Sequence, residues 1–207
     1  AIEAVRHDAP VTTAIARPAA TGHPPATPPG SSTNRTDPVR VAIVDSGIDQ
    51  THPALQGQVI ERVDLTDRQP NASAAVTNAS ALDGAGHGTM VAGVVAGNAE
   101  DYTGVAPEAA LIDIRVFDET GSGRASTVAA GIEYAVREAE ADIILTSLGY
   151  AGTDGQTISE AIAGAHAEGA VVVASAGNRG GRRSITAPGI APEAITVGSS
   201  HRNGVAT

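Results

Sequence analysis

Short runs of β-branched and other apolar residues alternate with longer segments of helical periodicity along this 207-residue chain. The apolar runs fall at 39–44, 110–117, 142–146, 170–175 and 194–197, and the helical segments at 88–97, 125–139 and 158–167. Strands that are apolar throughout are typical of parallel sheets, because helices cover both of their faces. The alternation therefore predicts an α/β fold with three layers, in which helices flank a mostly parallel β-sheet on both faces.

The N-terminal part of the chain has a different composition. Residues 9–38 are rich in Pro, Ala, Thr and Gly and contain two Pro-Pro pairs. Such a stretch buries little apolar surface and favours extended conformations. We expect residues 1–38 to be a linker or an N-terminal arm, and residues 39–207 to form one folded domain.

The composition excludes several classes of function. A net charge of −10 argues against nucleic acid as a partner, because phosphate binding needs a basic surface. No apolar run is long enough to span a membrane, and the lack of cysteine excludes disulfides and Cys-based zinc sites. Two Asn-Ala-Ser triplets, at Asn71 and Asn78, match a glycosylation sequon, which we interpret as a chance match in a polar loop.

Two polar residues stand where a general acid–base pair could form. Asp45 ends the first apolar run, where an aspartate serves either as a turn former or as a buried carboxylate that orients a histidine. His87 lies between Gly86 and Gly88, and we expect these glycines to leave its imidazole accessible, as a general base requires. The same glycines do not have dinucleotide-fold spacing, and no Gly-Lys-Ser/Thr occurs, which argues against nucleotide binding.

Asn178 follows the apolar run 170–175 through Ala176 and Gly177. Its side chain could cap local backbone, or its N–H could stabilise the oxyanion of a tetrahedral intermediate. In parallel sheets, the loops that leave the carboxyl ends of the strands carry function. Asp45, Ser147 and Asn178 each fall just after a predicted strand, so we expect them at one edge of the sheet.

Six motifs in order give the chain a resemblance to the subtilisin-like serine proteases (subtilases, peptidase family S8). They are VAIVDSGIDQTHP at 41–53, GHGTMVAG at 86–93, GVAP with ALI at 104–112, GSG at 121–123, SLG at 147–149 and ASAGN at 174–178. The chain order of aspartate, histidine and asparagine is that of the subtilisin family. The resemblance runs through nearly all of residues 39–200 and corresponds to the N-terminal two-thirds of the catalytic domain, so the fold is expected to be incomplete at its C-terminus.

The resemblance implies a serine endopeptidase that works by acyl transfer. It assigns catalytic roles to Asp45, His87 and Asn178. An extended peptide or protein substrate would lie as an added strand between two backbone segments, with main-chain bonds giving broad specificity. The residues that would bind it are Gly121, Ser122, Gly123, Ser147, Leu148, Gly149, Ala176 and Gly177.

The family's nucleophile motif, Gly-Thr-Ser-Met-Ala, does not occur in the sequence. Ser199 and Ser200 follow an apolar run but lack the glycine context of a nucleophile. Without the serine, Asp45 and His87 have nothing to activate, so the 207 residues alone are expected to be inactive. The family's serine begins a helix in the core, and without this helix we expect uncovered apolar sheet surface and a chain that is poorly stable or dependent on another chain. Three interpretations stay open: a piece of an active protease, a serine segment on a separate chain, and a non-catalytic peptide-binding or scaffold protein.

The resemblance also implies an extracellular or cell-envelope location and no required cofactor. Calcium-binding relatives carry an aspartate where this chain has Ala54. The loop between Gly97 and Gly104 is short for the family's strong calcium site. Because calcium takes six to eight oxygen ligands, we expect that site to be absent and assign no metal ligand.

Overall fold

The structure is a computed structural model. It describes residues 10–13, 37–66, 83–150, 155–181 and 183–199. The Asn-Ala-Ser triplets at Asn71 and Asn78 lie outside the described residues. In the part of the chain that is described, none of the helices has both the length and the apolarity needed to cross a bilayer.

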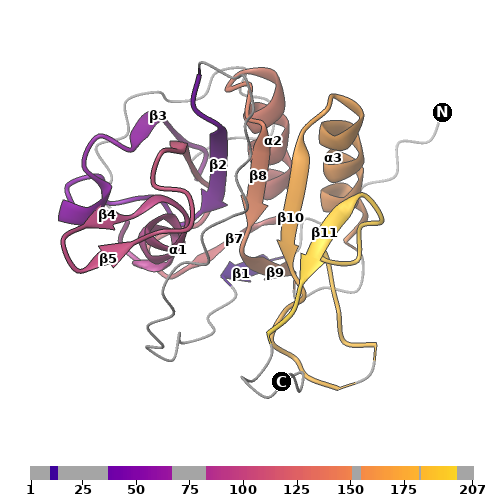
Figure 1. Cartoon of the computed structure of the whole chain (residues 1–207). Helices are drawn as coiled ribbons and strands as arrows, with labels where there is room; N and C mark the ends of the chain where they lie inside the picture. The colour runs from indigo at the N-terminus through magenta and orange to yellow at the C-terminus, as the bar shows by residue number, and fades with distance from the viewer. Residues whose placement is uncertain (1–9, 14–36, 67–82, 151–154, 182, 200–207) are drawn as a thin grey trace.

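A six-stranded sheet forms the middle layer (Figure 1). Its strands are β2 (Arg40–Asp45), β3 (Val59–Asp64), β6 (Ala110–Arg115), β8 (Ile143–Thr146), β10 (Val171–Ser175) and β11 (Ala194–Val197). They lie in the order β11-β10-β8-β2-β6-β3, and every neighbouring pair is parallel. The predicted mostly parallel sheet is thus confirmed, and β2 lies near its centre, buried along almost its whole length.

Helices cover the two faces of this sheet. They are α1 (His87–Ala96), α2 (Ala125–Arg137) and α3 (Gln156–Ala167), with a short 3₁₀ helix, η1 (Pro53–Leu55). Side chains of β2 alternate between two cores: Val41 and Ile43 pack with α1, whereas Ala42 and Val44 pack with α2 and α3. Because successive side chains point to opposite faces and helices cover both faces, the four residues 41–44 all have to be apolar.

A second, antiparallel sheet lies beyond the carboxyl ends of the parallel strands (Figure 1). It consists of β7 (Ser122–Arg124), β1 (Pro10–Thr13) and β9 (Leu148–Tyr150), with β1 in the middle. Strand β1 falls within the segment that we expected to be a linker or an arm. A further two-stranded hairpin joins β4 (Asn98–Ala99) to β5 (Tyr102–Thr103).

One face of the large sheet is open over β10 and β11. Ile43, Leu145, Val173 and Ile195 are aligned in one row across the sheet, so they lie on the same face. Over β2 and β6, helix α1 covers this face. Among the described residues, Ile195 and Val197 on this face are 57% and 55% exposed. This agrees with the expected uncovered apolar sheet surface.

Candidate active site

Asp45 occupies the last position of β2 and is almost fully buried. The pairing of β2 with β6 extends to Asp45, and the N–H of Val116 donates to the Asp45 carbonyl oxygen at 2.8 Å. The pairing of β2 with β8 covers Val41 to Ile43. The chain then turns at Gly47, whose φ of +110° is one that L-residues with side chains rarely adopt. The N–H of Ser46 donates to Asp45 Oδ1 at 2.7 Å, so the turn itself orients the carboxylate.

His87 is the first residue of α1, and its imidazole faces Asp45. The Nδ1 atom lies 2.8 Å from Asp45 Oδ1 and 2.9 Å from Oδ2. With Nδ1 carrying the proton, this contact fixes the tautomer in which Nε2 is unprotonated and can act as a base. The structure thus brings the predicted acid–base pair together from segments 42 residues apart.

The expectation that His87 is accessible is wrong for the residue as a whole, because only 6% of it is exposed. The glycine beside it allows close packing instead of exposure. A Cβ on Gly88 would lie 2.1 Å from the carbonyl oxygen of Gly47 and 3.2 Å from Asp45 Cβ. Only glycine therefore lets the start of α1 pack directly on the turn that follows Asp45.

Burial raises the pKa of the Asp45 carboxyl. The hydrogen bond and charge of His87, together with hydrogen bonds from Ser46, partly oppose this effect. An ionised carboxylate in such a site is favoured when its neighbour is positively charged. The pair is therefore suited to a histidine that gains a proton during a reaction.

Two of the predicted substrate-binding segments, 121–123 and 147–149, overlap β7 and β9, and β1 lies between these strands. We call the position between β7 and β9 the groove, and the two strands its walls. Thr12 is paired with Ser122 on one side and with Gly149 on the other. Val11 pairs with Gly123 of β7, and on the β9 side Thr13 pairs with Leu148. This is the strand addition that the sequence predicted for a substrate, carried out here by the chain's own N-terminal segment.

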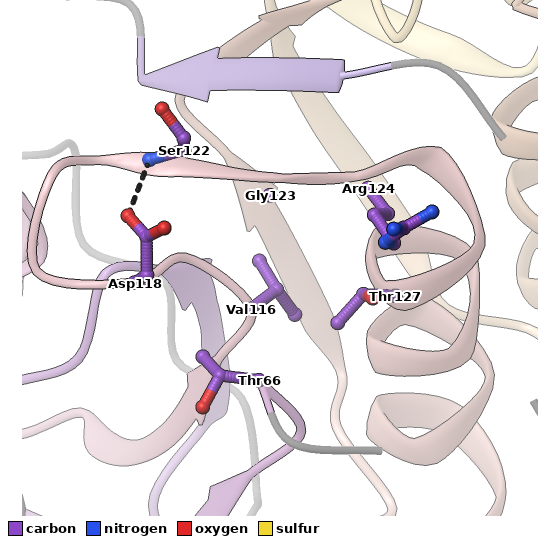
Figure 2. A pocket seen from close by; sticks show the side chains of 7 residues that line it. All are labelled: Thr66, Val116, Asp118, Ser122, Gly123, Arg124 and Thr127. Carbon is purple, nitrogen blue, oxygen red and sulfur yellow. Dashed lines mark hydrogen bonds between the residues drawn. The ribbon is translucent and has the colours of Figure 1, made fainter. Parts of the chain in front are cut away.

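A cavity of about 340 Å³ adjoins β7 (Figure 2). Its lining residues are Thr66, Val116, Asp118, Ser122, Gly123, Arg124 and Thr127. Asp118 accepts a hydrogen bond from the N–H of Ser122 and so shapes the turn that leads into the strand, in which Gly121 has φ +74°. A Cβ on Gly123 would lie 2.5 Å from the carbonyl oxygen of Val116, which explains the glycine in this wall.

The remaining predicted residues lie at the carboxyl edge of the sheet. Ser147 directly follows β8, and Ala176, Gly177 and Asn178 follow β10. Gly177 has φ +86°, a conformation that residues with side chains rarely adopt, and Asn178 is exposed. Since β8 lies between β10 and β2, Ser147 is placed between the segment of Asn178 and that of Asp45. Within the described residues, no group of three or more His, Asp or Glu side chains could hold a metal ion.

The sequence reasoning did not single out two residues around this pair. The Asp83 carboxylate and the Ser46 hydroxyl, 2.8 Å apart, connect the turn after β2 to the start of α1. An aspartate a few residues before a helix is a recognisable capping signal. The bond to Ser46 had no sequence signal, because it joins residues 37 positions apart.

The chain is similar in sequence to several known proteins. Residues 36–207 match the sequence model of the subtilase family. The chain is 38% identical over 168 residues to the major intracellular serine protease of Bacillus subtilis (strain 168), covering 78% of this chain and 50% of that protein. It is 37% identical over 168 residues to thermitase of Thermoactinomyces vulgaris, covering 79% and 56%.

The chain spans about half the length of these relatives. Among solved structures, sphericase superposes with a TM-score of 0.71 at 34% identity, covering 86% of this chain and 60% of that one. The match to the family model, over residues 36–207, includes Asp45, His87 and Asn178.

Proposed function

Because the chain belongs to the subtilase family, we propose that it carries the acid–base pair, the oxyanion donor and the substrate groove of a serine endopeptidase. The observation that carries this proposal is the buried contact between Asp45 and His87. This contact occurs in a structure whose groove walls already hold an extended strand.

In the proposed reaction, His87 Nε2 takes the proton of a serine hydroxyl as its oxygen attacks the peptide carbonyl carbon. Asp45 holds the Nδ1–H and stabilises the imidazolium that forms. The imidazolium then gives its proton to the leaving amine, and water hydrolyses the acyl-enzyme by the same route. No residue of the 207 is assigned as this serine, and we propose that polypeptide outside them supplies it, either downstream or on a separate chain.

Asn178 is the proposed side-chain donor to the oxyanion. Its exposed position after β10 leaves its amide unburied at the carboxyl edge of the sheet. A donor that meets the oxygen only as negative charge develops stabilises the transition state by about 3–4 kcal/mol.

The proposed substrate is an extended peptide or protein segment. It would replace β1 between β7 and β9 and make the same main-chain pairs. Such pairs do not depend on side-chain identity, so broad specificity is expected. A relative named as intracellular shows that family membership does not fix the compartment, and the extracellular or cell-envelope location stays a prediction.

A non-catalytic peptide-binding protein is the second candidate, because the groove holds a strand whereas the sequence contains no nucleophile motif. Labelling of the full-length protein with a fluorophosphonate separates the two. An endopeptidase should be labelled in the wild type, and His87→Ala should abolish the label. His166→Ala, an exposed histidine at the end of α3, is the matched control and should keep it.

Retained labelling of His87→Ala would contradict the assignment of the base. An unlabelled wild type that still binds an extended peptide would favour the second candidate. We expect the 207 residues alone to give no label.

A further inference from the structure

The carboxylate of Asp83 accepts four hydrogen bonds, two on each oxygen. Oδ1 accepts from the Ser46 hydroxyl at 2.8 Å and from the N–H of Gly86 at 2.8 Å. Oδ2 accepts from the N–H of Thr89 at 2.8 Å and from its hydroxyl at 2.7 Å. One side chain thus joins the turn after β2 to the first turn of α1.

Each partner of Asp83 is next to, or two residues away from, one member of the acid–base pair. Ser46 follows Asp45, donates its N–H to that carboxylate, and accepts the N–H of Gly88 on its hydroxyl at 3.0 Å. Gly86 and Thr89 lie on either side of His87. The four hydrogen bonds of Asp83 touch neither reacting group, and through their partners they couple the position of the carboxylate to that of the imidazole.

A helix cap alone would not need all of these bonds. Gly86 occupies the N-cap position of α1 and has no side chain to cap it, so Asp83 satisfies the N–H groups of Gly86 and Thr89. The bond from Ser46 adds nothing to the cap. It fixes the angle between the helix and the turn that carries Asp45.

We propose that Asp83 is a positioning residue of the acid–base pair, acting through Ser46 to hold Asp45 and His87 at hydrogen-bond distance. This inference rests on the proposed function for its kinetic consequence. The positional claim itself concerns only the contact between the two side chains, and it can be tested without turnover.

Two variants separate positioning from capping. Ser46→Ala removes the coupling bond and leaves the N–H groups of Gly86 and Thr89 with their acceptor, although the N–H of Gly88 loses the Ser46 hydroxyl. Asp83→Asn keeps the shape but replaces one acceptor oxygen with an NH₂ donor, so the N–H of either Gly86 or Thr89 loses its acceptor. The control is Asp101→Asn, an exposed carboxylate in the turn between β4 and β5.

The readouts are the imidazole Nδ1–H resonance of the full-length protein labelled with ¹⁵N-histidine, the kcat and KM on a fluorogenic peptide, and the thermal midpoint. In Ser46→Ala we expect a shifted and faster-exchanging resonance, together with a thermal midpoint lowered by a few degrees because the N–H of Gly88 loses its acceptor. We also expect kcat to fall roughly tenfold to a hundredfold with KM within about twofold, because small displacements of reacting groups cost rate and not binding.

An Nδ1–H resonance in Ser46→Ala with the position and exchange rate of the wild type would overturn the inference, whatever the activity. A fall in the thermal midpoint with unchanged kcat and an unchanged resonance would reduce Asp83 to a cap and would also overturn it. If the wild type neither cleaves peptides nor reacts with a fluorophosphonate, the proposed function fails, and the resonance alone decides the positional claim. If Asp83→Asn does not fold, Ser46→Ala carries the test.

Discussion

The Nε atom of Arg62 lies 2.6 Å from Asp113 Oδ2, and the same oxygen accepts the N–H of Ile48 at 3.1 Å. Asp113 is 1% exposed, and its other oxygen has no hydrogen-bond partner in the described structure. The guanidinium of Arg62 also donates to the carbonyl oxygen of Ile48. This buried ion pair thus supports the turn that begins at Asp45 from the β6 side.

Stability should depend on pH through Asp113. Burial raises its pKa from 3.8 to about 6, although Arg62 opposes the shift. The folded state therefore binds this proton more tightly than the unfolded state. The stabilisation that the folded state gains from this proton is fully present below the ordinary pKa of 3.8 and is lost as pH rises through about 6. Two pKa units correspond to about 3 kcal/mol.

Asp113→Asn, which cannot titrate, should remove this slope. Urea unfolding followed by circular dichroism between pH 4 and 7 measures it as the difference between wild type and variant. Equal pH dependence of the two proteins would show that Asp113 does not titrate in this range.

Gly88→Ala should damage both stability and the acid–base contact. The added Cβ would meet the Gly47 carbonyl oxygen at 2.1 Å, so either the helix or the turn has to move. Overpacking of this kind costs about 1–3 kcal/mol. Urea unfolding gives the stability, and the His87 Nδ1–H resonance reports the contact.

Gly93→Ala, in the same helix, is the matched control. An added Cβ there has no atom within 4 Å, and replacing a mid-helix glycine with alanine should stabilise the protein by about 0.5–1 kcal/mol. If both variants changed stability in the same direction, the close packing of Gly88 on Gly47 would not be the cause.

Thr12→Pro should free the groove for added peptides. Thr12, like Val11, pairs with both walls, and a proline at Thr12 removes its N–H and disfavours a central strand position. A tethered strand competes with a free peptide at high effective concentration. We therefore expect an uncleaved extended peptide to bind roughly tenfold more tightly, measured by fluorescence polarisation.

Thr12→Ala keeps the backbone N–H and should bind the peptide as the wild type does. An affinity unaltered by the proline would mean that β1 does not compete for the groove in solution.

Replacing Ile195 and Val197 with threonine should reduce self-association of the 207-residue chain. Both side chains are more than half exposed on the open face of the sheet, and exposed apolar patches promote association. Threonine keeps the branched Cβ that suits a strand. Size-exclusion chromatography should show more monomer for the double variant. Ile60→Thr, an exposed residue of β3, should change little, and an equal effect there would point to a general gain in solubility.

The central sheet could be predicted because its strands carry local signals. The apolar runs around Ile43, Ile112 and Val173 are long enough to define buried strands, and each lies within about two residues of the predicted range. Asp45 could be placed for the same reason, since it directly ends such a run. The family motifs then predicted which histidine would face it.

The groove strands and the burial of His87 could not be predicted in the same way. Strands β7 and β9 have three residues each, include glycine, and become ordered strands only by pairing with β1. The burial of His87 follows from a contact between Gly88 and Gly47, which no local pattern encodes. Tertiary contacts decide both features.

The contact between Gly88 and Gly47 joins backbone to backbone, so the depth at which α1 packs on this turn does not depend on the side chains of the helix's outer surface. Residues on the outer surface of α1, such as the exposed Val94, can change without altering the depth at which the helix sits. Over evolutionary time, the surface of this helix is therefore free to diversify. The two glycines and the polar residues that join them have to be retained together.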